Sequence, residues 1–177
     1  MKLCMFSPVE MDLERGWPGR VDGDTVVQLA AQTLQSFFTG GGDAREHAVY
    51  PVADVAFRAP VLHPPSVRIF DGEANFRFAN PAAIINPDAS VDVPGAVPTD
   101  RDAAIIGADG KIAGFTPFIE WTASDLSGEK ARDFALTLGP VVTTFDEAVQ
   151  ADDQYWDYIV WLSAENTRLY PGDLIVW

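Results

Sequence analysis

The sequence is poor in residues that carry nucleophilic and proton-transfer chemistry near neutral pH. Among its 177 residues there is one cysteine, Cys4, and there are two histidines, His47 and His63. A single cysteine excludes an internal disulfide bond and a cluster of thiolate zinc ligands, and it favours a reducing, cytoplasmic setting. Cys4 lies in the first apolar segment, where it is expected to be a small buried hydrophobe.

Positive charge is also scarce. The chain carries 12 lysines and arginines against 26 aspartates and glutamates, which gives a formal net charge of −14 and a pI near 4.2. Nucleic acids and anionic membrane surfaces are bound by clustered lysine and arginine. We therefore expect neither as a partner, and we expect the scattered acidic residues to form a solvated surface.

Long hydrophobic runs are missing as well. The opening "MKLCMF" is too short for the apolar region of a signal peptide, and no apolar run has membrane-spanning length. With 47% hydrophobic and 21% charged residues, the composition predicts a folded, soluble protein with a sizeable core.

What is present is a series of short apolar runs separated by glycine, proline and aspartate. This pattern predicts a mainly β protein with few helices, arranged as a roll or a barrel-like sheet. Residues 1–60 read as a small N-terminal α/β domain with an Asp-Gly turn at Asp22 and a helical period over 26–38. The Pro64-Pro65 pair reads as a connector to a core domain, residues 61–177. Residues 128–135 are a second candidate helix, and "ASVDVP" (89–94) is a candidate strand.

Several segments, in order along the chain, resemble the fumarylacetoacetate hydrolase superfamily. The segments that carry the resemblance are "RVDGDTVVQL", "APVLHPPSVRIF", "FANPAAIINPDASVDVP", "AAIIG", "KIAGFTPFIEWTASDL", "KARDFALTLGPVVTT" and "NTRLYPGDLI". The resemblance implies a fumarylacetoacetase-like mixed β-roll, a small N-terminal domain and a homodimer. It also implies a small 2-oxo or β-keto acid as ligand, polarised by Mg²⁺ or Ca²⁺ that carboxylates hold.

The family's metal ligands are two glutamates spaced Glu-x-Glu on one strand and an aspartate on a later strand. Alternate residues of a strand share a face, so this spacing points both glutamates at the metal. Direct alignment places Thr99 and Arg101 at the two glutamate positions and Glu120 at the third. A one-residue slip would instead bring Asp100 and Asp102 to the same face as Glu120 and make a three-carboxylate metal site; without the slip, both aspartates are solvated.

Other family positions are matched unevenly. Lys130 aligns with a lysine that binds substrate or orders the site, and the backbone from Asn80 through Ala82 aligns with a segment that lines the pocket. The family's general-base histidine has no counterpart between residues 71 and 79. Glu73, or Asp71, is the nearest carboxylate that can replace it, although both are typical turn formers.

Two functions therefore remain open. The first is an enzyme that hydrolyses, decarboxylates or tautomerises a small 2-oxo acid with a carboxylate-bound metal. The second is a non-catalytic relative that binds a ligand or assembles subunits. The segment 152–163, acidic and then aromatic, is a candidate edge strand covered by a partner subunit. The family's chains continue beyond the "PGDLIVW" segment, so we expect either a natural truncation here or a piece of a longer product.

Overall fold

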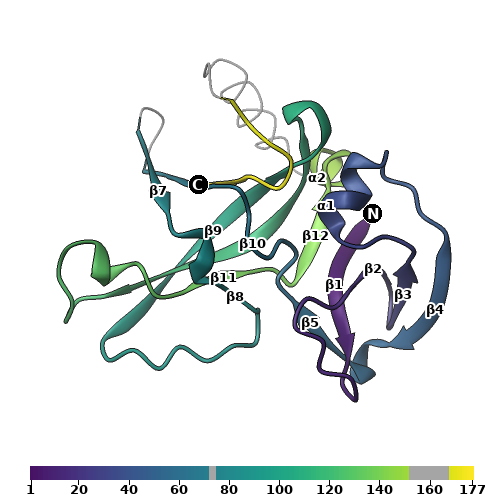
Figure 1. Ribbon diagram of the computed structural model, residues 1–177, viewed down its shortest axis with the longest axis horizontal. Helices are drawn as coiled ribbons and strands as arrows, with labels where there is room; N and C mark the ends of the chain where they lie inside the picture. The colour runs from purple at the N-terminus through teal and green to yellow at the C-terminus, as the bar shows by residue number, and fades with distance from the viewer. Residues whose placement is uncertain (72–74, 152–167) are drawn as a thin grey trace.

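The computed structural model describes residues 1–71, 75–151 and 168–177, and these residues are mostly β-structure (Figure 1). The strands are β1 (Lys2–Pro8), β2 (Trp17–Asp22), β3 (Thr25–Leu29), β4 (Glu46–Pro51), β5 (Val55–Arg58), β6 (Val67–Phe70), β7 (Phe76–Ala79), β8 (Ile84–Ile85), β9 (Ala96–Ile106), β10 (Ile112–Ala123), β11 (Leu136–Leu138), β12 (Val141–Thr144) and β13 (Leu174–Val176). The helices are α1 (Leu34–Thr39) and α2 (Phe145–Ala151), with 3-10 turns η1 (Val52–Asp54), η2 (Pro81–Ala83), η3 (Ala108–Gly110) and η4 (Gly128–Ala131). The prediction of a mainly β protein with few helices is confirmed.

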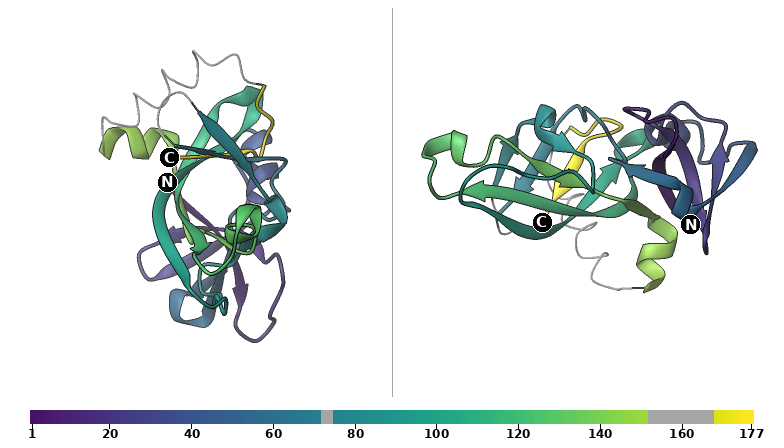
Figure 2. Two further views of the ribbon diagram at one scale, coloured as in Figure 1. Left: turned by 90° about the vertical axis from the view of Figure 1, so that its left-hand side faces the viewer. Right: turned by 90° about the horizontal axis from the view of Figure 1, so that it is seen from below.

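The strands form one mixed sheet in the order β4-β3-β2-β1-β12-β10-β9-β13-β6-β7. Strand β5 also pairs with β1, and β11 pairs with both β10 and β8. The pairs β13–β6 and β11–β8 are parallel, while the other pairs are antiparallel. Figure 2 shows how this sheet curls into a roll, with the N-terminal strands beside it, as predicted for a mixed β-roll.

The N-terminal segment follows its sequence signals in part. Strands β2 and β3 form a hairpin in which Asp22 pairs with Thr25, so the predicted Asp-Gly turn is confirmed. The predicted helix over 26–38 begins later than expected, because its first residues continue β3 and pair with β2 and β4. Helix α1 starts after Thr33, whose hydroxyl accepts a hydrogen bond from the Ser36 amide at 3.0 Å.

Three other local predictions were wrong or incomplete. Residues 89–94 form no strand, and the candidate helix over 128–135 is reduced to η4. Helix α2 was not predicted, although Asp146 and Glu147 in its first turn are a helix-start signal. A hydrogen bond with the Thr144 hydroxyl lowers the pKa of Asp146. The candidate edge strand at 152–163 lies outside the described residues.

The side chains of β9 and β10 alternate between two hydrophobic clusters. The inner cluster holds Ile105 and Phe118 together with Leu3 and Leu34 from the N-terminal segment. The outer cluster holds Phe115 and its neighbours. Because the inner cluster contains residues from both sides of position 60, the division into domains 1–60 and 61–177 stays a prediction. Among the described residues, none of the helices combines the length and apolar character needed to cross a bilayer.

Cys4 gives a pH-dependent test of the packing around β1. The residue is fully buried, and desolvation raises the pKa of its thiol to about 12. Above about pH 9 the thiol ionises in the unfolded chain but not in the folded chain, so stability falls as pH rises toward 12. We expect wild type to lose about 1.5 kcal/mol more than Cys4→Ala between pH 7.5 and 10, measured by urea unfolding. Equal losses would contradict this burial.

Candidate functional site

The pairing of β9 with β10 decides which side chains share a face with Glu120. Glu120 lies opposite Thr99, and Phe118 lies opposite Arg101, so these residues share the inner face of the roll. Asp100 and Asp102 lie opposite Ile119 and Pro117 and therefore belong to the other face. This register puts Thr99 and Arg101 on the face of Glu120, so the one-residue slip that would bring Asp100 and Asp102 there is wrong.

Glu120 is enclosed by two arginines. Its side chain is 4% exposed, and Arg101 donates from Nε to Glu120 Oε2 at 3.1 Å. Arg77 Nη2 donates to the other carboxylate oxygen, Oε1. Arg77 reaches this position because it pairs with Ile69 in the β6–β7 hairpin and so faces the inner cluster. Both oxygens of the Glu120 carboxylate are therefore bound to guanidinium groups.

Asp71 completes the group. Its Oδ1 accepts from Arg101 Nη2 at 2.9 Å, and its Oδ2 lies 3.6 Å from Arg77 Nε. Arg101 also donates from Nη1 to the Phe70 carbonyl at 3.2 Å. Asp71 follows β6, and its amide donates to the Asn75 carbonyl across the turn. We call Asp71, Arg77, Arg101 and Glu120 the ion-pair cluster; its formal charges cancel.

Comparisons with known proteins agree with this architecture. No family model and no curated protein matches the sequence. Among solved structures, maleylpyruvate hydrolase from Sphingobium sp. SYK-6 is 21% identical with a TM-score of 0.71, and the match covers 99% of this chain and 87% of that one. A putative HpcE protein from Mycobacterium smegmatis is 20% identical with a TM-score of 0.73, and the match covers 99% and 85%. The chain has the fumarylacetoacetate hydrolase fold.

Proteins with the fumarylacetoacetate hydrolase fold have been solved with divalent metals. The Sphingobium hydrolase has a complex with manganese(II) and pyruvate, at 20% identity, a TM-score of 0.69 and coverage of 99% and 87%. A 2-keto-3-deoxy-D-arabinonate dehydratase is complexed with magnesium and 2,5-dioxopentanoate, at 16% identity, a TM-score of 0.65 and coverage of 99% and 86%. These metals and ligands belong to those proteins.

The ion-pair cluster of this chain does not fit such a metal. Hard divalent cations need several oxygen ligands, but Thr99 is a weak neutral donor and Arg101 carries a permanent positive charge. Both oxygens of Glu120 already accept from arginine. Asp102, whose pKa is raised by desolvation, lies on the other face of β9 and cannot add a ligand beside Glu120. In the part of the chain that the structure describes, no three His, Cys, Asp or Glu side chains are placed to hold a metal ion.

In the described ranges, the remaining predicted residues make no hydrogen bond or ion pair with the cluster. Asn80 and Ala82 lie together at η2, where Asn80 Oδ1 accepts from the Ala82 amide at 3.0 Å and caps the turn. Lys130 is exposed on η4. Glu73 lies outside the described residues. The roles predicted for these residues stay predictions.

From the sequence, Arg77 was missed, and Asp71 was considered only as a turn former or a replacement for the general base. The available signal was the alternation in "NFRFA". Arg77 stands between two phenylalanines, so in a strand its guanidinium lies on the face opposite both rings. Its partner could not be inferred, because Arg77 and Glu120 are 43 positions apart in the chain.

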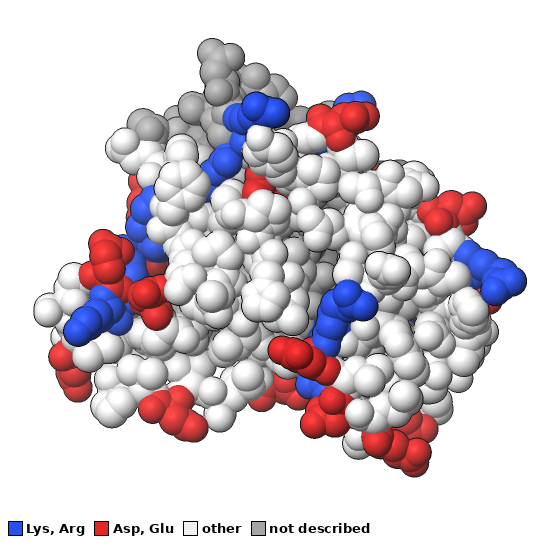
Figure 3. All heavy atoms as spheres, in the orientation of Figure 1, with Lys and Arg blue, Asp and Glu red and all other residues white. Residues whose placement is uncertain are grey.

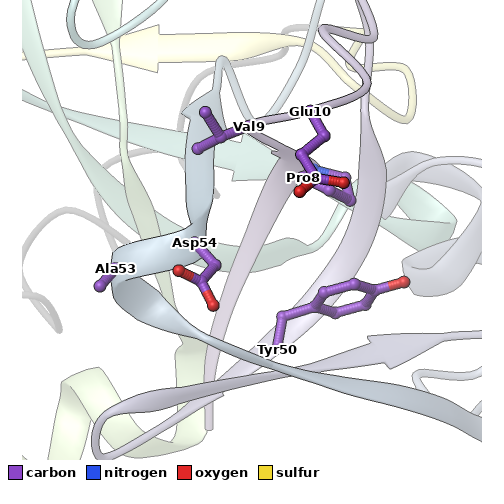
Figure 4. Close-up of a pocket in the computed structure, with 6 residues that line it drawn as sticks. All are labelled: Pro8, Val9, Glu10, Tyr50, Ala53 and Asp54. Atoms are coloured by element: carbon purple, nitrogen blue, oxygen red, sulfur yellow. The ribbon is translucent and has the colours of Figure 1, made fainter.

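Outside the ion-pair cluster, charged side chains are dispersed. A hollow in the N-terminal segment lies apart from the cluster. Figure 3 shows acidic and basic side chains scattered over one face, mostly toward its margin, with one basic and several acidic side chains also below its middle. The hollow in the N-terminal segment is open and has a volume of about 450 Å³, and Figure 4 shows the side chains that line it. Its lining residues are Pro8, Val9, Glu10, Tyr50, Ala53 and Asp54. None of them belongs to β6, β7, β9 or β10, which carry the ion-pair cluster.

Proposed function

We propose that this chain binds a small 2-oxo or β-keto carboxylic acid at the ion-pair cluster, without a divalent metal and without hydrolysing it. The observation that carries the proposal is the pair of guanidinium groups, Arg77 and Arg101, on the inner face beside buried Glu120. Guanidinium groups bind carboxylates through paired, charge-assisted hydrogen bonds. The ligand class is supported by the fold, because a protein of this fold has been solved with pyruvate.

The positions of the two histidines argue against hydrolysis. Hydrolysis of a carbon–carbon bond needs a general base to activate water, and histidine has the most suitable pKa for that role. His47 lies exposed on β4, and His63 lies exposed in the proline-rich connector. These are the only histidines of the chain, and neither lies on the strands that carry the cluster.

A second candidate is a metal-dependent enzyme that hydrolyses, decarboxylates or tautomerises a 2-oxo acid. It is favoured by the neighbours solved with manganese or magnesium and an oxo acid. In that case Glu120 would be a metal ligand, Lys130 would pair with the substrate carboxylate, and the backbone at Asn80 and Ala82 would line the pocket. Glu120 would first have to leave both arginines.

Titration with oxaloacetate and pyruvate separates the two candidates. We expect saturable binding by calorimetry in EDTA, with no gain in affinity from Mg²⁺, Mn²⁺ or Ca²⁺. Arg101→Gln should weaken binding about tenfold or more, because it removes charge-assisted hydrogen bonds. Arg101→Lys keeps the positive charge but loses the paired N–H donors of the guanidinium group. Its affinity should therefore lie between that of wild type and that of Arg101→Gln.

Binding that appears only with metal, together with loss of oxaloacetate absorbance or release of CO₂, would contradict the metal-free proposal and support the enzyme. The expected homodimer and cytoplasmic location stay predictions from the sequence.

A further inference from the structure

Asp71 differs from the other members of the ion-pair cluster in how firmly it is held. Its side chain is 56% exposed, whereas that of Glu120 is 4% exposed and those of Arg101 and Arg77 are 18% and 22% exposed. Each Glu120 oxygen accepts a hydrogen bond from a different arginine, but Asp71 accepts from Arg101 alone. Asp71 is therefore the member whose hydrogen bond to arginine a solvent molecule or solute can most easily replace.

Among the hydrogen bonds of Arg101, one goes to an acceptor that a solute can replace. Its Nε is bound to buried Glu120, and its Nη1 is bound to the Phe70 carbonyl in β6. Only Nη2 is bound to a side chain that is largely in solvent, that of Asp71. An exposed ion pair contributes little free energy, so the exchange of one carboxylate for another at Nη2 costs little.

Arg77 provides a second donor beside that position. Its Nε is buried and makes no hydrogen bond to any described residue, and it lies 3.6 Å from Asp71 Oδ2. A buried donor without an acceptor is unfavourable, and an acceptor placed there gains the hydrogen bond in full. A 2-oxo acid carries a ketone oxygen next to its carboxylate, so one molecule can meet both Arg101 Nη2 and Arg77 Nε.

We propose that Asp71 is an internal stand-in for the ligand carboxylate: it occupies the arginine pair in the free protein, and a 2-oxo acid displaces it on binding. This inference rests on the proposed function and specifies how that site is regulated. Without Asp71, the two arginines would face Glu120 alone, and the cluster would keep one uncompensated positive charge. Asp71 therefore lowers the affinity for an anionic ligand.

The test compares oxaloacetate and pyruvate binding to wild type, Asp71→Asn and Asp100→Asn in EDTA at one ionic strength. Asp100→Asn is the matched control, because it removes the same charge from an exposed residue on the opposite face of β9. We expect Asp71→Asn to bind about fivefold more tightly than wild type, the upper range for release of an exposed ion pair. Asp100→Asn should bind like wild type. Asp71→Ser serves as a second variant if the asparagine variant does not fold.

The outcomes distinguish the inference from the proposed function. Tighter binding by Asp71→Asn, or binding by that variant alone, supports displacement. Equal or weaker binding by Asp71→Asn, with wild type still binding, overturns the inference and leaves the proposed function intact. If no variant binds either acid, both fail. Propionate, which lacks the ketone oxygen, should bind more weakly than pyruvate; equal affinity would overturn the assignment of Arg77 Nε to the ketone.

Discussion

Replacing Glu120 with glutamine should lower the free energy of unfolding by about 3 kcal/mol, the lower range for removing one partner of a buried ion pair. Glutamine keeps the size of the side chain but loses the charge that balances Arg77 and Arg101, which are themselves mostly buried. Two guanidinium groups would then remain close together with only Asp71 as a counter-charge. Urea denaturation followed by tryptophan fluorescence measures the change.

Glu129→Gln is the matched control for this prediction. Glu129 carries the same carboxylate but is exposed on η4, so its substitution should change stability by no more than about 0.5 kcal/mol. A Glu120→Gln variant that is as stable as the Glu129→Gln variant would mean that the arginines do not depend on Glu120 for charge balance.

The second prediction is that two substitutions on one strand create a metal site. In Thr99→Glu/Arg101→Glu, three carboxylates would share the inner face, because position 99 lies opposite Glu120 and position 101 is the next residue of β9 on that face. In EDTA this variant should be less stable than wild type, since like charges are crowded together. Mn²⁺ should reverse that loss, with a gain of about 2.7 kcal/mol at a metal concentration one hundred times the dissociation constant.

The control places the same two glutamates on the opposite face of the same strand. Asp100→Glu/Asp102→Glu lengthens both outward carboxylates without moving them toward Glu120. Its stability in urea should not depend on Mn²⁺. If this control responds to Mn²⁺ and Thr99→Glu/Arg101→Glu does not, the assignment of faces on β9 is wrong.

Much of the fold was predictable because its strands are short apolar runs with clear turn signals. The Asp22 turn, the β6 and β7 runs, and the apolar parts of β9 and β10 all follow from such local patterns. Predictions from local sequence were wrong where a helix signal and a strand signal overlapped. The segment after Val26 has a helical period, yet pairing with β2 and β4 on either side holds its first residues in a strand. Helix α2 was not predicted, because it is short and its acidic first turn is its main local signal.

The sequence by itself determined which residue types occupy the positions of the expected metal ligands: a threonine, an arginine and a glutamate at 99, 101 and 120. It also determined that no histidine lies between residues 71 and 79, since composition and order along the chain are sufficient for both statements. Only the tertiary structure decided the register of β9 against β10, and thus that Asp100 and Asp102 point away from Glu120. It alone brought in Arg77 and Asp71, because their contacts with β9 and β10 depend on how the roll closes. Strand register has no local sequence signal, since a shift by one residue leaves the composition unchanged but moves every side chain to the other face of the sheet.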